Sequence, residues 1–238
     1  MGGWEQIWQG DGARQLWSVP DRRVLQLTAK WNESKTIRRV LDLGCGVGRH
    51  VYLLASLGFE AYGLDHSETG LETCGRRLQA DGLKATLHRG DMSVIPYPDG
   101  YFDAVLAFNS IYHGTSQQVD KGVELVRRKL RVGGECFATF LSRANRLYGK
   151  GEAMEPHTFN DPRMYKELFA ADGESGVTHH FSSEEEVRHF FRAYEIESLE
   201  HEELRLALPG KNGGAPSWLP IRKSYFWQIV ARKVDRHA

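Results

Sequence analysis

Three glycines at alternate positions, Gly44, Gly46 and Gly48, follow a short apolar stretch that contains Asp42. Glycine has no Cβ, so the backbone at these positions can approach a bound molecule closely and adopt a positive φ without strain. Residues 49–57 then carry apolar side chains at helical spacing, which would bring the free amide groups of a helix N-terminus to the same place. The stretch therefore predicts a strand, a glycine turn and a helix that together hold a ligand.

Two other glycine-rich loops do not fit this spacing. A dinucleotide-binding turn needs Gly-x-Gly-x-x-Gly or Ala, and the third such position counted from Gly44 is the large Arg49. A Walker loop needs Lys followed by Ser or Thr after the last glycine, and neither is present. The pattern that remains, Asp42-x-Gly-x-Gly-x-Gly, resembles the first motif of the class I S-adenosylmethionine-dependent methyltransferases.

Three later stretches resemble the same family in the expected order and spacing. Residues 63–65 (Gly-Leu-Asp) are similar to the second strand with its acidic end. Residues 90–92 (Gly-Asp-Met) are similar to the turn that contacts adenine, and residues 95–105 (IPYPDGYFDAV) to the entry into the fourth strand. The four motifs lie within residues 38–142, about half of the chain.

The resemblance implies which residues bind the donor, S-adenosylmethionine, and its demethylated product, S-adenosylhomocysteine. Asp65 would bind the ribose hydroxyls and Asp91 the edge of the adenine. The amino acid tail would lie at the glycine turn with Asp42 and Arg49 nearby, and residues 109–110 would meet the methionine part. The implied donor-binding set is Asp42, Gly44, Cys45, Gly46, Gly48, Arg49, Leu64, Asp65, His66, Gly90, Asp91, Met92 and Asn109.

Some of these residues also have plainer interpretations. Asp65 could cap the following helix and bind no ligand, although Ser67 is the better N-cap residue. Asp91 could be a turn residue, because Asp readily bonds its own backbone in turns. We expect Cys45 to be a small buried residue of the turn and not a nucleophile.

Methyl transfer is an in-line displacement at carbon, so a protein contributes mainly by positioning the two reactants. A base is needed only if the acceptor carries its proton at neutral pH. Tyr112 and His113 follow the fourth predicted strand and are the candidate catalytic residues, with His113 as the base because histidine titrates near neutral pH. The alternative is that the two side chains only shape the acceptor pocket.

Three further histidines raise the question of a metal site. His179 and His180 are adjacent, so in a strand their side chains would face opposite ways. Neither they nor His157 belong to a convincing set of ligands, so we predict no metal. We expect His157 to contact a lid and the adjacent pair to pack or cap.

Composition limits the choice of partners and location. The 238 residues hold 31 Lys and Arg and 31 Asp and Glu, so no net charge attracts nucleic acid or an anionic membrane. The three cysteines contain no Cys-x-x-Cys pair, which favours a reducing compartment. No leader or run of roughly 18 apolar residues is present, so we expect a cytoplasmic protein. The charge balance, and the absence of an Asn/Asp-Pro-Pro-Tyr signature, indicate a small-molecule acceptor.

From residue 37 onward, strands alternate with amphipathic helices, which predicts a doubly wound α/β fold with ligands at the carboxyl ends of parallel strands. The family resemblance implies a mostly parallel, seven-stranded, Rossmann-like sheet whose last strand is antiparallel. The expected strands are 38–43, 59–65, 83–88, 101–108, 135–141, 194–200 and 225–231. The expected helices are 48–57, 67–80, 116–130 and one that starts at a capping box, 183–186.

We expect one domain, residues 1–238, with four parts. Residues 1–36 form a helical cap, in which Trp4, Ile7 and Trp8 share one face. The cap would cover the edge of the sheet or, alternatively, its aromatic residues would roof the active site. The other parts are the cofactor-binding core (37–142), a lid or insertion (143–180) with a helical pattern near 162–170, and a C-terminal helix and hairpin (181–238) with a loop at 208–224.

Three rival functions stay open at this point. They are a methyltransferase that acts on protein or RNA, a catalytically silent S-adenosylmethionine-binding protein, and a nicotinamide oxidoreductase. Arg49 in place of a third glycine argues against the last. The methyl acceptor, the attacked atom and the oligomeric state, monomer or homodimer, do not follow from the sequence.

Overall fold

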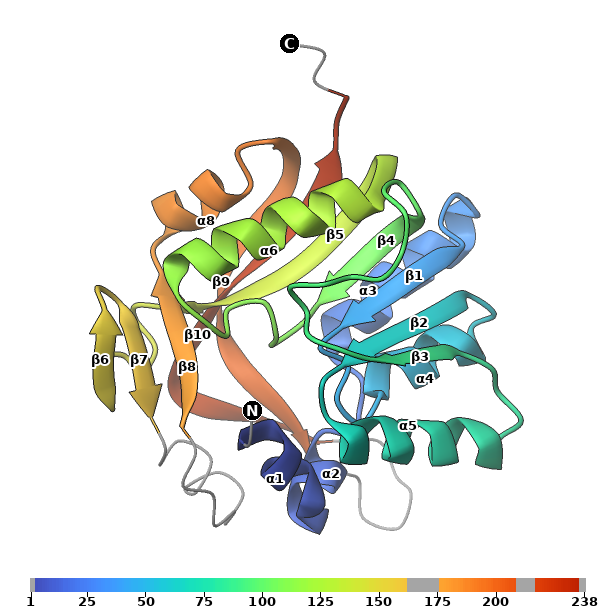
Figure 1. Ribbon diagram of the computed structural model, residues 1–238, viewed down its shortest axis with the longest axis horizontal. Helices are drawn as coiled ribbons and strands as arrows, with labels where there is room; N and C mark the ends of the chain where they lie inside the picture. The colour runs from blue at the N-terminus through green and yellow to red at the C-terminus, as the bar shows by residue number, and fades with distance from the viewer. Residues whose placement is uncertain (1–2, 162–175, 209–216, 236–238) are drawn as a thin grey trace.

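A twisted sheet with helices on both faces forms the centre of the molecule, a computed structural model that describes residues 3–161, 176–208 and 217–235 (Figure 1). Five strands run parallel in the order β3-β2-β1-β4-β5. The hairpin β9–β10 continues the sheet, and β10 is antiparallel to β5. The bounds are β1 (Arg39–Leu43), β2 (Glu60–Asp65), β3 (Thr86–Arg89), β4 (Phe102–Ala107), β5 (Leu130–Ser142), β9 (Tyr194–Leu208) and β10 (Ser217–Lys233).

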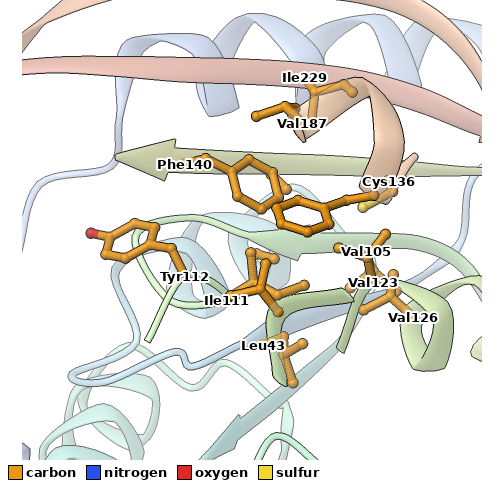
Figure 2. Close-up of a cluster of buried hydrophobic side chains, with 14 of the residues drawn as sticks. Leu43, Val105, Ile111, Tyr112, Val123, Val126, Cys136, Phe140, Val187 and Ile229 are labelled. Atoms are coloured by element: carbon orange, nitrogen blue, oxygen red, sulfur yellow. The ribbon is translucent and has the colours of Figure 1, made fainter. Parts of the chain in front are cut away.

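Alternate residues of the strands feed two separate hydrophobic cores, because successive side chains in a strand point to opposite faces. Val40 packs in one core and Leu41 in the other. The first core lies under α3 (Arg22–Ser34), α4 (Arg49–Ser56) and α5 (Glu68–Ala80), and the second under α6 (Ser116–Lys129) and α8 (Glu184–Phe190). Figure 2 shows part of the second core, with Val123, Val126 and Val187 of the helices beside residues of the strands. The predicted doubly wound fold is confirmed.

Side-chain caps fix where α5, α6 and α8 begin. Ser67 accepts a hydrogen bond from the backbone of Gly70 and starts α5, as predicted. Thr115 and Gln118 form a reciprocal capping box at the start of α6. Ser183 caps α8 at its predicted position. The first two caps decide where the turns after β2 and β4 end, and residues of those two turns line the pocket described below.

The predicted count of seven strands is too low for the described sheet, which has ten. The additional strands are β6 (Glu152–Glu155), β7 (Thr158–Asp161) and β8 (Val177–Ser182), all within the expected insertion. They form because β5 is longer than β4, so its free end at Leu141 and Ser142 pairs with β8. The expected helical pattern near 162–170 lies outside the described residues.

Two other boundaries differ from the prediction. β5 begins at Leu130 and not at 135, because Leu130 pairs with Phe102 across an irregularity in the ladder. β10 begins at Ser217, so the end of the expected 208–224 loop is strand, and residues 209–216 are outside the described part. The predicted antiparallel hairpin of the last two strands is confirmed.

The predicted N-terminal helical cap consists of three helices, and Gly10 separates α1 (Gly3–Gln9) from α2 (Asp11–Leu16). Asp21 then caps α3 by accepting a hydrogen bond from Arg23. Figure 1 shows α1 and α2 beside the start of α5, next to the carboxyl ends of β1 and β2. Across the described segments, no helix has both the length and the apolar character that a membrane span requires.

Candidate active site

A pocket lies at the carboxyl ends of β1, β2 and β4, where the glycine turn begins. All three glycines of the turn have positive φ, with values of 74°, 53° and 75° at Gly44, Gly46 and Gly48. A Cβ on Gly44 would lie 2.4 Å from the Cβ of Ser110. Gly44 is glycine because no other residue allows both the positive φ and this close packing.

Asp65 ties the end of β2 to the glycine turn. One of its carboxylate oxygens accepts a 2.8 Å hydrogen bond from the amide of Gly46, and the other accepts a 2.8 Å bond from the amide of Ser67. Burial raises the pKa of Asp65, and the bonds from Ser67 and Gly46 act in the opposite direction. Each oxygen retains acceptor capacity. Asp65 therefore supports the helix start and also lines the pocket beside the turn.

Asp42, at the end of β1, is buried and lines the same pocket. Its Oδ2 has no hydrogen-bond partner in the described chain, and Nδ1 of His50 lies 3.9 Å away. Burial raises the pKa of Asp42 to about 7, while the nearby Arg49 guanidinium lowers it and Asp65 raises it further. A buried carboxylate oxygen without a partner fits a bound ligand that brings its own cationic donor.

Arg49 begins α4 and projects into the pocket between elements far apart in the sequence. Its guanidinium lies over the ring of Trp17 at 4.5 Å and over the ring of Phe108 at 4.8 Å. It also donates a 3.5 Å hydrogen bond to the carbonyl of Val19. Burial lowers the pKa of Arg49 to about 10, with Asp21 and Asp42 opposing that change, so the side chain stays cationic at neutral pH.

Aromatic residues of the N-terminal cap cover the turn. A Cβ on Gly46 would meet the indole of Trp8 at 2.6 Å, and Trp4 stacks on Trp8 with ring centroids 5.6 Å apart. Glu5 holds α1 in place by accepting hydrogen bonds from the hydroxyls of Ser67 and Thr69. Trp4 and Trp8 line the pocket. The cap therefore covers the pocket, which agrees with the second of the two interpretations given above.

Trp31 of the same cap covers the sheet and not the pocket, as the first of the two interpretations expected. Trp31 is buried under the sheet, where its indole donates a 2.7 Å hydrogen bond to Glu135 and meets the ring of Phe59 edge to face. The cap therefore both closes one face of the sheet, through α3, and covers the pocket, through α1 and α2.

Comparisons with known proteins agree with this geometry. Residues 40–134 match the family model described as a methyltransferase domain. The chain is 35% identical over 98 residues to 2-phytyl-1,4-naphtoquinone methyltransferase of Synechococcus elongatus, which is 39% of each protein. It is 34% identical over 125 residues to demethylmenaquinone methyltransferase of Clavibacter sepedonicus, covering 52% of this chain and 46% of that one.

A solved structure of an S-adenosylmethionine-dependent methyltransferase from Methanosarcina mazei shares the fold, with a TM-score of 0.64 over 85% of this chain and 96% of that one, at 19% identity. Residues 40–134 therefore match a methyltransferase domain, and the chain has the fold of an S-adenosylmethionine-dependent methyltransferase. The resemblance seen in the four sequence motifs is thereby confirmed. The chain spans less than half the length of the two curated relatives named above.

Tyr112 and His113 line the same pocket as Asp65, and the centroids of their rings are 4.6 Å apart. His113 also meets the ring of Trp4 at 5.1 Å and that of His179, on β8, at 4.9 Å. Burial lowers the pKa of His113 well below 6.5, and His179 and His66 lower it further, against a hydrogen bond to the Ser110 backbone. Its Nε2 is shielded from solvent and has no hydrogen-bond partner among the described residues.

The remaining residues of the predicted donor site fall into two groups. Asn109 lines the pocket from a left-handed backbone position, with φ of 55°, and its side-chain oxygen accepts a hydrogen bond from Thr139. Burial raises the pKa of Cys45, so the thiol stays protonated, as expected for a small buried residue. Nine others also line the pocket: Asp42, Gly44, Gly46, Arg49, Leu64, Asp65, His66, Gly90 and Met92.

Two predicted donor-site residues do not line the pocket. Asp91 is exposed and accepts a 2.8 Å hydrogen bond from the amide of Ser93, which is the turn role given above as its alternative. Gly48 faces away from the pocket toward α5, where a Cβ would lie 2.0 Å from the sulfur of Cys74. Gly48 therefore allows the turn to pack on the helix.

Residues without a motif complete the pocket wall. Asn145 to Leu147 form a turn after β5, in which the Asn145 amide donates to the carbonyl of Tyr225 and accepts from Leu147. No periodicity marks these positions, and only long-range pairing brings them to the pocket. The wall residues that the sequence did not single out are Val47, His50, Phe108, Leu141, Asn145, Arg146, Leu147, Ser224 and Phe226.

The histidines considered for a metal have other partners. His157 forms a 2.6 Å hydrogen bond with the hydroxyl of Tyr148. His180 is buried, bonds Thr158 at 2.8 Å and lies 3.1 Å from a carboxylate oxygen of Glu186. Within the described segments, no group of three histidine, cysteine or acidic residues is arranged to hold a metal ion.

Proposed function

We propose that this chain transfers the methyl group of S-adenosylmethionine to a small-molecule acceptor bound beside Tyr112 and His113. The observation that carries the proposal is the hydrogen bond from Gly46 to Asp65, because it joins the bare backbone of the turn to a strand-end carboxylate inside one pocket. A nucleoside linked to an amino acid needs both features, the carboxylate for its ribose hydroxyls and the turn for its tail.

The two buried charges fit the zwitterionic tail of the donor. The unpartnered oxygen of Asp42 would accept from the tail ammonium, and the cationic Arg49 would face the tail carboxylate. Asp65 would accept from the ribose hydroxyls with the capacity left on its oxygens. Leu64 and Met92 would contact the faces of the adenine. Once bound, the donor supplies an activated methyl group, and the protein orients its neighbours.

His113 is proposed as the hydrogen-bond acceptor for the nucleophile. Its lowered pKa keeps the imidazole neutral at neutral pH, so the ring has a lone pair available and no charge that would repel the donor. Burial raises the pKa of Tyr112, so the phenol stays protonated and acts as a donor or as a wall. The proton of a weakly acidic hydroxyl or amine would pass to His113 as the methyl bond forms.

A small acceptor fits the chemistry of the wall and the balance of charge. Leu141, Leu147 and Phe226 line the pocket with the cap tryptophans, and such apolar surface suits an aromatic or alicyclic body. The named relatives methylate a naphthoquinone and a demethylmenaquinone according to their descriptions, which supports a cyclic acceptor here. The free, buried cysteines support a reducing compartment, the cytoplasm.

Titration calorimetry with S-adenosylhomocysteine tests the donor site. We expect micromolar binding by the parent protein and a loss of about 10- to 100-fold in the Asp65→Asn variant, because charge-assisted hydrogen bonds are lost. Asp99→Asn, an exposed substitution paired with Lys129, serves as the matched control and should bind like the parent. Unfolding curves of each variant show whether the fold is intact.

The same binding experiment and an assay of methyl transfer separate the rival functions. Binding of reduced nicotinamide cofactor in preference to S-adenosylhomocysteine would favour an oxidoreductase and reject the proposal. For transfer, a panel of small phenols and hydroquinones is incubated with methyl-labelled donor, and His113→Asn should lower turnover while leaving S-adenosylhomocysteine affinity unchanged. Label that enters only protein or RNA in a parallel incubation would contradict a small-molecule acceptor.

A further inference from the structure

The segment that follows α2 borders the donor pocket although it carries none of the family motifs. Trp17 is the C-cap residue of α2, and its ring contacts the Arg49 guanidinium at 4.5 Å. Two residues later, the carbonyl of Val19 accepts from the same guanidinium. Asp21, at the end of the segment, raises the pKa of Arg49 by its charge. This short stretch of the cap therefore interacts with the Arg49 guanidinium in three ways.

This segment is fixed to the core independently of Arg49. The amide of Asp21 donates a 3.2 Å hydrogen bond to Nε2 of the buried His50. The guanidinium of Arg77, on α5, donates a 2.9 Å bond to the carbonyl of Ser18. Trp17 is therefore presented to Arg49 by an anchored stretch of backbone.

Arg49 needs such a partner because two carboxylates compete for its guanidinium. Asp42 and Asp21 both attract the guanidinium, and a long side chain has several rotamers in which to reach them. The ring faces of Trp17 and Phe108 instead contact the guanidinium, and these contacts use none of its N–H donors, of which one donates to Val19. A planar edge with two parallel donors is suited to a carboxylate.

We infer that Trp17 is a positioning residue of the donor site, which holds the Arg49 guanidinium in the orientation that binds the carboxylate of the amino acid tail. The inference rests on the proposed function and adds to it a residue outside the motifs. It makes the N-terminal cap part of the binding site for the donor tail, while the ribose and adenine are bound by β2 and the turn after β3 alone. A change at Trp17 should therefore affect the tail and spare the nucleoside.

Two ligands that differ only at the tail test this inference by calorimetry. S-adenosylhomocysteine carries the carboxylate and ammonium, whereas 5′-methylthioadenosine lacks both. We expect Trp17→Leu to weaken S-adenosylhomocysteine by about 10-fold, the scale of a desolvated cation–π contact, and to change 5′-methylthioadenosine affinity by less than about twofold. Trp17→Phe retains a ring and should recover most of the loss.

A thermodynamic cycle shows whether Trp17 acts through Arg49. Arg49→Met should produce the same tail-selective loss, and the double variant with Trp17→Leu should lose no more than Arg49→Met alone. Additive losses would overturn the inference. Arg76→Gln is the matched control, since Arg76 is exposed on α5 and bonds Thr73 and not the segment, and a tail-selective loss there would also overturn the inference.

The outcomes distinguish this inference from the function on which it rests. A parent protein that binds neither ligand would refute the proposed function itself. A parent that binds S-adenosylhomocysteine, with Trp17→Leu lowering the affinity for both ligands equally or for neither, would refute only the role of Trp17. Circular dichroism and unfolding midpoints show that each variant is folded before its binding is compared.

Discussion

The buried carboxyl group of Asp42 should make the stability of the protein depend on pH in a way that Asp42→Asn removes. Its pKa is about 7 in the folded protein, against an ordinary value of 3.8. A carboxyl group whose pKa rises on folding contributes stability below the unfolded pKa, and that contribution is lost as the pH rises through the folded pKa. From about pH 8 to about pH 5.5, these values correspond to a gain of about 2 kcal/mol in the parent. Asparagine does not titrate and has no such gain.

Urea unfolding of the parent and of Asp42→Asn near pH 8 and near pH 5.5 measures this difference. Buried His50 and His113 have lowered pKa values and act in the opposite direction, but both are present in the two proteins, so the comparison between variants removes their effect. Asp99→Asn is the control, because the pKa of Asp99 is already lowered by Lys129 and Arg128 and its charge does not change in this range.

The result that refutes the reasoning is a difference between parent and Asp42→Asn that stays constant, within about 0.5 kcal/mol, at the two pH values. Saturating S-adenosylhomocysteine provides a further check. If its ammonium pairs with Asp42, the carboxyl group stays ionised, so the pH-dependent difference should shrink in the presence of the ligand. Binding near pH 5.5 should also release a proton to the buffer, which calorimetry in two buffers of different ionisation enthalpy detects.

Two further predictions concern the turn and the inserted strands. Gly48→Ala should lower the free energy of unfolding by about 1–3 kcal/mol, because the new Cβ meets Cys74 and forces a strained positive φ; a urea midpoint equal to that of the parent would contradict this. The pKa of Glu186 is lowered to about 2 by His180 and Arg143, so its carboxylate stabilises the fold above the ordinary pKa and loses that contribution as the pH falls. Glu186→Gln should therefore make the free energy of unfolding depend less steeply on pH in the acid range. Acid-unfolding midpoints by circular dichroism that are identical for the variant and the parent would count against this.

Most of the proposed donor half of the pocket could be predicted from the sequence because its residues are close together in the chain. Strand, turn and helix from Asp42 to Arg49 are local structure, and Asp65 is one strand away along a parallel ladder. Hydrophobic alternation fixes which face each strand presents, so the strand ends could be placed before any coordinates existed. The same reasoning named Asn109, which the structure brings to the pocket.

Apart from Tyr112 and His113, the proposed acceptor half could not be predicted, because it depends on pairings between distant residues. β8 adds to the end of β5 only where β4 has stopped, and no local pattern marks that point. His179 reaches His113 through this strand. The surplus length of β5 and the anchored turn at Asn145 are tertiary features, which local periodicity does not encode.

The N-terminal cap connects the two halves of the pocket. Trp17 contacts Arg49 at the proposed donor tail, and Trp4 contacts His113 at the proposed acceptor end. Glu5 fastens the helix that carries Trp4 to the start of α5, which itself begins just after Asp65. On this proposal, the family motifs specify the fold and most of the donor site, whereas the cap helps to decide what else fits beside the donor. A relative with the same motifs and a cap that keeps Trp17 but differs at Trp4 should keep the affinity for S-adenosylhomocysteine and change its acceptor, because Trp4 contacts His113.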